Sequence, residues 1–143
     1  MNEPVLQLFN TSGVSLPIRE EALRHTLNRI EQREAVQFAL LEVVYVDEEE
    51  IVRINQAHLG RDYITDIITF RYDERENNRE IEGTLFCCAP RIYEQAEVFD
   101  SETNEEFHRI FIHGLLHLIG YDDQTPEGKR EMTALEEKYL SPA

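Results

Sequence analysis

The stretch VQFALLEVVYV, residues 36–46, predicts a long β-strand around which the other elements can be placed. It is rich in β-branched and aromatic residues, which favour extended backbone. Before it, VLQLF (residues 5–9) predicts a first strand. Between residues 19 and 33, three apolar residues recur at helical spacing on one face: Leu23, Leu27 and Ile30. The chain therefore opens with a strand, a helix and a second strand.

The segment after the long strand predicts a helix followed by a hairpin. Asp47 is suited to cap a helix over residues 48–58, because its carboxylate can accept from the first free backbone N–H groups. Ile67–Arg71 predicts a strand, and IEGTLFCCA (residues 81–89) predicts another. The polar stretch RENNRE (residues 75–80) separates them. A short polar connection between two strands indicates a hairpin.

The remainder of the chain is predicted to be helical. Pro90 can open a helix in which Ile92, Ala96 and Phe99 form an apolar stripe. Thr103 with Glu106 has the pattern of a capping box, starting a helix that runs to Ile119, and Pro126 begins a last helix to about residue 140. No repeat or linker divides the sequence. We expect one α+β domain over residues 1–143, with a mixed, mainly four-stranded sheet packed against helices.

Composition and charge narrow the possible classes of protein. The chain is 41% apolar and 30% charged, which is typical of a soluble globular protein. No apolar run approaches the roughly 20 residues that cross a bilayer. The N-terminal MNEPVLQLFN is acidic and lacks a long apolar core, so it does not resemble a secretory signal. We expect a cytoplasmic protein without a membrane partner.

The net charge of −15 argues against a generic nucleic-acid binder. Affinity for nucleic acids rests largely on neutralising phosphates, although a local basic surface remains compatible with this total. The two cysteines, Cys87 and Cys88, are adjacent, and neighbours in a strand point to opposite faces. They predict neither a disulfide nor a cysteine zinc site, and we interpret them as small residues that fill a strand.

The stretch HGLLHLIGYDD, residues 113–123, carries the strongest functional signal. His113 and His117 lie one helical turn apart, hence on the same face of the predicted helix. Gly120 is suited to end that helix in a left-handed conformation, so that the chain can bring Asp123 back toward the imidazoles. Two imidazoles and a carboxylate, with a position left for water, are typical of a catalytic zinc site. The predicted site therefore lies on the penultimate helix and just after it.

The two histidines are also compatible with a site that binds no metal. Two histidines at this spacing also occur on half-buried helices, and we interpret the other three, His25, His58 and His108, as core residues. The added glycine and carboxylate favour metal binding. Asp122 is the alternative ligand, or a hydrogen-bond partner of a histidine ring N–H.

Two stretches of the chain resemble the YbeY family of bacterial rRNA maturation factors. HGLLHLIGYDD is similar to the family signature HGxLHLxGYDH, with Asp123 in place of the last histidine. NQAHLGRDYITDIITF (residues 55–70) is similar to a second family motif, N-x-x-Y-R-G-K-D-K-P-T-D-V-L-S-F. The identical positions there are Asn55, Gly60, Asp62, Thr65, Asp66 and Phe70.

The resemblance implies a zinc-dependent, single-strand-specific endoribonuclease. Its implied roles are rRNA processing, including maturation of the 16S rRNA 3′ end of the small subunit, and ribosome quality control. It implies that His113, His117 and Asp123 hold one divalent metal ion, first of all Zn²⁺. The implied partners are precursor rRNA and the small ribosomal subunit, with ribosomal proteins and an assembly GTPase in addition. It assigns no separate catalytic residue and no oligomeric state.

Several positions depart from the family pattern. The family's phosphate-proximal arginine falls at Leu59, and Arg61 is the candidate to replace it as a substrate contact. The family's loop proline is Ile64, and its Gly-Asp pair after the hairpin is Gly83-Thr84. Asp123 lowers the charge of the site by one relative to histidine. The lower charge makes metal-bound water a weaker acid, and the harder oxygen ligand is more favourable for manganese than an imidazole is.

Two other functions compete with RNA hydrolysis. A metalloprotease of this pattern would carry a glutamate directly after the first histidine, where this chain has Gly114. The second rival is a non-catalytic ribosome assembly factor that contains a structural metal and binds basic ribosomal proteins. The missing arginine and the acidic net charge favour this function over a metalloprotease.

Overall fold

A four-stranded sheet forms the centre of the computed structural model, which describes residues 5–72 and 80–141. Its strands lie in the order β1-β2-β4-β3. Strands β1 (Leu6–Asn10), β2 (Gln37–Val46) and β4 (Glu80–Cys88) are parallel, and β3 (Ile67–Arg71) runs antiparallel to β4. The predicted mixed sheet and α+β fold are confirmed.

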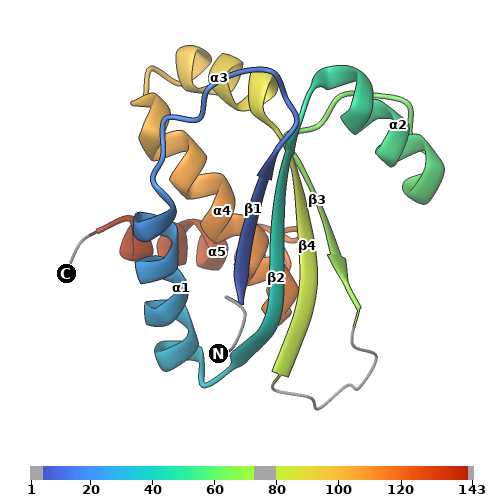
Figure 1. Cartoon of the computed structure of the whole chain (residues 1–143). Coiled ribbons are helices and arrows are strands. Elements are labelled where there is room, and N and C mark those ends of the chain that lie inside the picture. Colours follow the sequence, from blue (N-terminus) through green and yellow to red (C-terminus); the bar gives the residue numbers. More distant parts are fainter. Residues whose placement is uncertain (1–4, 73–79, 142–143) are drawn as a thin grey trace.

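Five helices surround the sheet within the described residues (Figure 1). They are α1 (Glu20–Glu34), α2 (Glu48–Leu59), α3 (Ala89–Val98), α4 (Thr103–Ile119) and α5 (Pro126–Leu140). Helices α1, α3, α4 and α5 cover one face, whereas α2 packs near one end of the other face. The predicted strands and helices occur with boundaries shifted by at most about two residues, but residues 75–79 of the predicted polar connection lie outside the described part.

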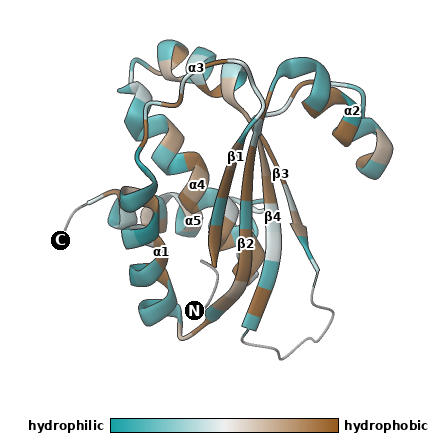
Figure 2. Cartoon of the chain, in the orientation of Figure 1, coloured by the Kyte–Doolittle hydropathy of each residue, from teal (hydrophilic) through white to brown (hydrophobic). Residues whose placement is uncertain are grey.

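The main core fills the space between the sheet and the four helices on that face. The strands are mainly apolar apart from polar residues near the ends of β3 and β4, and the helices carry polar residues along much of their length, as Figure 2 shows. Strand β2 contributes Phe38, Leu41, Val43 and Tyr45, all buried. A register irregularity between Phe38 and Leu40 places Phe38 and Leu41 on the same face despite their odd spacing.

A smaller core lies on the opposite face, under α2. It contains Val46, Ile51, Ile68 and Cys88, whereas Cys87 belongs to the main core. Both thiols are buried and free, so the prediction that the adjacent cysteines fill opposite faces of a strand is confirmed.

The helix ends confirm some of the predicted caps and correct others. Asp47 caps α2 by accepting from the backbone N–H of Glu50 at 2.8 Å. The capping box at Thr103 is wrong, because Thr103 is already helical and Glu102, the N-cap, makes no side-chain cap bond. The predicted apolar stripe on α3 is also wrong at its last position. Ile92 and Ala96 are buried, but Phe99 follows the helix and is exposed.

The histidines outside HGLLHLIGYDD correct the prediction of core positions. His25 is exposed on α1. His58 is exposed too and forms a T-shaped contact with Phe70, with the ring centroids 5.1 Å apart. His108 is half-buried, and its Nε2 lies 2.6 Å from Oγ1 of Thr26. None of the described helices is long and apolar enough to cross a membrane.

Close packing of α4 against the sheet depends on Gly114. A Cβ atom at this position would lie 2.8 Å from Cδ1 of Ile67 and 2.9 Å from Cδ1 of Leu85. Only the absence of a side chain lets the helix axis approach β3 and β4 this closely. The helix that carries both histidines is thereby fixed in position relative to the sheet.

Candidate metal centre

His113 and His117 form a pair on the half-buried face of α4. Their ring centroids are 4.7 Å apart. The helix ends at Gly120, whose N–H donates to the carbonyls of Leu116 and His117. Its φ of 127° is one that residues with a side chain rarely adopt, so glycine allows the chain to turn here. The predicted helix end at Gly120 is confirmed.

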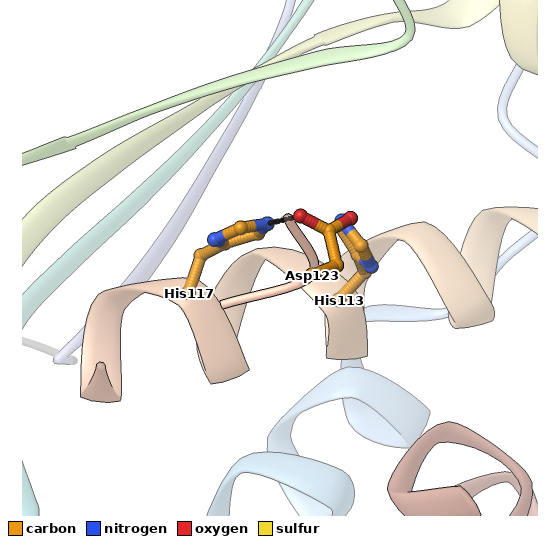
Figure 3. Close-up of side chains that lie close together, drawn as sticks. All are labelled: His113, His117 and Asp123. Carbon is orange, nitrogen blue, oxygen red and sulfur yellow. Dashed lines mark ion pairs between the residues drawn. The ribbon is translucent and has the colours of Figure 1, made fainter. Parts of the chain in front are cut away.

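The turn after Gly120 brings Asp123 back to both imidazoles (Figure 3). Its Oδ2 lies 3.6 Å from Nε2 of His113, and its Oδ1 lies 3.6 Å from Nε2 of His117. The three residues offer ligand atoms within 4.8 Å of one another. Atoms held about 2.0–2.1 Å from a tetrahedral zinc ion stand roughly 3.4 Å apart, so only small shifts are needed to hold one ion. The donor set fits a divalent metal.

Glu136, on α5, completes the surroundings of His113. Its Oε2 accepts a hydrogen bond from Nδ1 of His113 at 2.6 Å, and its Oε1 lies 3.5 Å from a guanidinium nitrogen of Arg109. Glu136 is only 7% exposed. A proton on Nδ1 leaves Nε2, which faces Asp123, with its lone pair free for a metal.

Glu136 was missed from the sequence, although a signal existed. It lies one turn after Met132 and one before Tyr139, all three buried on one face of α5. A glutamate on such a face requires a partner, because buried charges are costly unless paired. Asp122, the partner considered for a histidine ring, instead accepts from the backbone N–H of Gln124 at 2.9 Å.

The pKa values of the two imidazoles are shifted in opposite directions. Burial lowers the pKa of His113, but its hydrogen bond to Glu136 and the charges of Glu136 and Asp123 outweigh this, so the pKa is raised above its usual value. Burial and the charge of His113 together lower the pKa of His117. Without metal, His113 therefore binds an additional proton more readily than His117 does.

A cavity of about 340 Å³ adjoins these residues and contains His113, Asp123 and Glu136 in its wall. Asp66, from the second motif, lines the same cavity. Its carbonyl accepts from the backbone N–H of Cys88 at 2.8 Å, which fixes the start of β3 to the end of β4. The fold thus brings the two motifs to one place.

The other predicted site positions lie elsewhere. Arg61 is exposed on the loop after α2 and is not among the described residues that line this cavity. Leu59, at the family's arginine position, is exposed as well. Asn55 orders this loop by donating from Nδ2 to the carbonyl of Tyr63 at 2.9 Å. Thr84 donates from Oγ1 to Oε1 of Glu42 at 3.0 Å and is not among the described residues of the cluster or of the cavity wall.

Comparison with known proteins agrees with this geometry. The family model described as "Endoribonuclease YbeY" matches residues 10–143. Proteins named endoribonuclease YbeY are similar along nearly the whole chain. The one from Chlorobium limicola is 40% identical over 95% of this chain and 91% of its own length. The one from Cytophaga hutchinsonii is 38% identical over 99% and 97%.

A solved structure has the same fold. The solution structure of a Thermotoga maritima protein superposes with a TM-score of 0.64, at 27% sequence identity, and the match covers 94% of this chain and 86% of that one. Sequence and structure together show that the chain belongs to the YbeY family of endoribonucleases.

Proposed function

We propose that this protein is a metal-dependent, single-strand-specific endoribonuclease of rRNA processing. The proposed activity is maturation of the 3′ end of 16S rRNA and removal of defective ribosomes in quality control, in the cytoplasm. The observation that carries the metal dependence is the convergence of His113, His117 and Asp123 within 4.8 Å. Membership of an endoribonuclease family supports RNA as the substrate.

In this proposal the chain's own residues prepare a site for one divalent ion, first of all Zn²⁺. Nε2 of each histidine and a carboxylate oxygen of Asp123 hold it, while Glu136 fixes the ring orientation of His113. A bound divalent ion activates water or polarises a phosphoryl oxygen. Asp123 adds a negative charge and a hard oxygen donor, which favours manganese more than a third histidine would. Comparing Zn²⁺ and Mn²⁺ affinities of the wild type and Asp123→His tests this preference.

Arg61 is the proposed substrate contact. Its exposed guanidinium can bind a phosphate through two parallel N–H groups. Each phosphate contact to a single strand contributes about 0.7 to the slope of log affinity against log salt. Arg61→Ala should reduce the slope by roughly that amount. Arg24→Ala is the matched control, because Arg24 pairs with Glu20 on α1.

Cleavage of a structured rRNA precursor tests the proposed activity. Metal-loaded wild type should cut it, and His113→Ala should lose most of the activity because one ligand is gone. His25→Ala is the matched control, since this exposed histidine on α1 lies outside the cluster. Equal cleavage by the wild type and His113→Ala would refute catalysis at this site.

An assembly role without cleavage is the second candidate function. The net charge of −15 favours it, because an acidic surface suits basic ribosomal proteins, the small subunit and an assembly GTPase better than bare RNA. A purely structural metal would be required for folding, and a catalytic one only for cleavage.

Peptide hydrolysis has no support from the geometry. The position of a metalloprotease glutamate is Gly114, where any side chain would run into Ile67 and Leu85 of the sheet. A glutamate there could not reach water beside His113 without displacing the helix.

A further inference from the structure

Phe99 is a large apolar side chain that the fold leaves in solvent. It is 66% exposed, although the apolar stripe of α3 predicts it to be buried. The backbone around it is well ordered by hydrogen bonds. The N–H of Phe99 donates to Gln95 at 2.9 Å, and the N–H of Ser101 donates to Ala96 at 2.9 Å. These bonds fix the backbone that carries the ring, and burial in either apolar core does not account for this side chain.

The ring lies at the wall of the same cavity that contains His113 and Asp123. Helices α3, α4 and α5 enclose this space, with Phe99, Ile110 and Met132 as apolar lining residues. Gln95 and Thr133 add an amide and a hydroxyl, both able to donate and accept hydrogen bonds. A ligand held at the metal cluster therefore has an aromatic face and polar groups beside it.

The charges of the cavity select the kind of group that can enter. Asp66 and Asp123 are acidic, and the basic residues among the described residues that line the cavity are Lys129 and the proposed metal ligand His113. Glu136 is paired with Arg109 and His113. Burial raises the pKa of Glu106, although the charge of Arg109 opposes this. Such a space repels a phosphate away from the metal but accepts an uncharged ring with exocyclic donors.

We propose that Phe99 and Gln95 form a stacking subsite for a nucleobase of single-stranded RNA next to the scissile phosphate. The inference rests on the proposed nuclease function and deepens it. Stacking on an aromatic ring is available to every base, and it requires a base that is not stacked in a duplex. The subsite therefore gives a physical basis for single-strand preference.

The chain contains no tryptophan, so one introduced indole reports on the subsite alone. Phe99→Trp should lose fluorescence when metal-loaded protein is titrated with a short single-stranded RNA, because the base stacks on the indole. The same sugar–phosphate chain with abasic residues should cause little change. Val98→Trp is the matched control, since Val98 is 73% exposed but does not line the cavity.

Binding measurements with truncated side chains complete the test. Phe99→Ala should weaken single-stranded RNA binding by roughly 5- to 150-fold, the loss expected for one stacked base. Val98→Ala should bind as the wild type does, and metal affinity should be the same in all three proteins. Thermal melting of each variant controls for folding.

The outcomes separate this inference from the proposed function. If the wild type cleaves RNA but Phe99→Ala binds it equally well, or if the Phe99→Trp signal matches that of Val98→Trp, the stacking subsite is refuted and the nuclease stands. If the wild type neither binds nor cleaves single-stranded RNA, the proposed function is refuted and the subsite with it.

Discussion

His113 is constrained from two sides, because carboxylates face both of its ring nitrogens. Asp123 faces Nε2 and Glu136 accepts from Nδ1, and Arg109 neutralises part of the charge of Glu136. A free imidazole can carry its proton on either nitrogen and rotate. Here the buried glutamate holds the ring by accepting from Nδ1, so Nε2 already faces Asp123 and can give its lone pair to an ion once Nε2 has released its proton.

Replacement of Glu136 by glutamine should therefore weaken metal binding. An amide can present its NH₂ group to Nδ1 and favour the wrong tautomer, and loss of such a partner typically costs about 10- to 100-fold in metal affinity. Chelator competition with Zn²⁺ measures this. Glu137→Gln is the matched control, because Glu137 also pairs with Arg109 but is exposed. Equal affinities of Glu136→Gln and wild type would refute the role of Glu136.

Contacts between elements decide how firmly α4 holds the histidines. On one side, Gly114 allows close approach to β3 and β4. On another, His108 bonds Thr26 of α1. The two histidines proposed as metal ligands come from a helix fixed by the sheet and by a second helix, and Asp123 reaches them from the turn that follows.

Gly114→Ala should destabilise the protein although alanine is the better helix former. The propensity gain is at most about 1 kcal/mol, whereas forcing a methyl group into a packed core costs typically about 1–3 kcal/mol. Leu85 is fully buried and cannot move aside into solvent. We expect a lower midpoint of urea unfolding with an unchanged slope. A midpoint at or above that of the wild type would show that α4 can shift.

The bond between α1 and α4 should make stability depend on pH. Burial and the charge of Arg29 lower the pKa of His108 in the folded protein. The unfolded chain therefore binds the proton more readily than the folded protein does. The contribution of His108 to the free energy of unfolding is fully present above the unfolded pKa near 6.5, and it is lost as the pH falls below that value.

His108→Gln should flatten the loss of stability between pH 6.5 and 5, because the amide can keep a bond to Thr26 without titrating. Urea unfolding of both proteins at several pH values measures this slope. His25→Gln is the control, since His25 is exposed. A slope in His108→Gln equal to that of the wild type would refute the assignment.

For the whole molecule, the two apolar cores do not involve the metal cluster. The cluster residues are half-buried at the surface, and none of them belongs to either core. This arrangement differs from that of small zinc domains, in which the metal replaces a core. Folding and metal binding should therefore be separable.

Removal of metal by a chelator should leave the fold intact and abolish cleavage. A free metal concentration of 100 times the dissociation constant adds about 2.7 kcal/mol to the free energy of unfolding. This raises Tm by only several degrees. Circular dichroism and melting curves with and without chelator measure this. Complete unfolding on chelation would favour the assembly factor with a structural metal.

The sequence alone determined the features that depend on neighbouring residues, namely the faces, ends and caps of helices. Helical periodicity placed His113 and His117 on one face, Gly120 marked the helix end, and Asp47 marked a cap, because each rests on backbone geometry within a turn. The order of strands and helices followed from local propensity in the same way.

The tertiary structure alone decided which distant residues meet. Glu136 lies 23 positions after His113 and comes from another helix, and Asp66 directly precedes the edge strand β3, so no local pattern links them to the histidines. Phe99 continues the apolar spacing of α3, yet the helix ends before it and the ring enters solvent. Whether a side chain is buried, and which distant residue it contacts, depends on how the helices and strands pack, and this packing involves the whole chain.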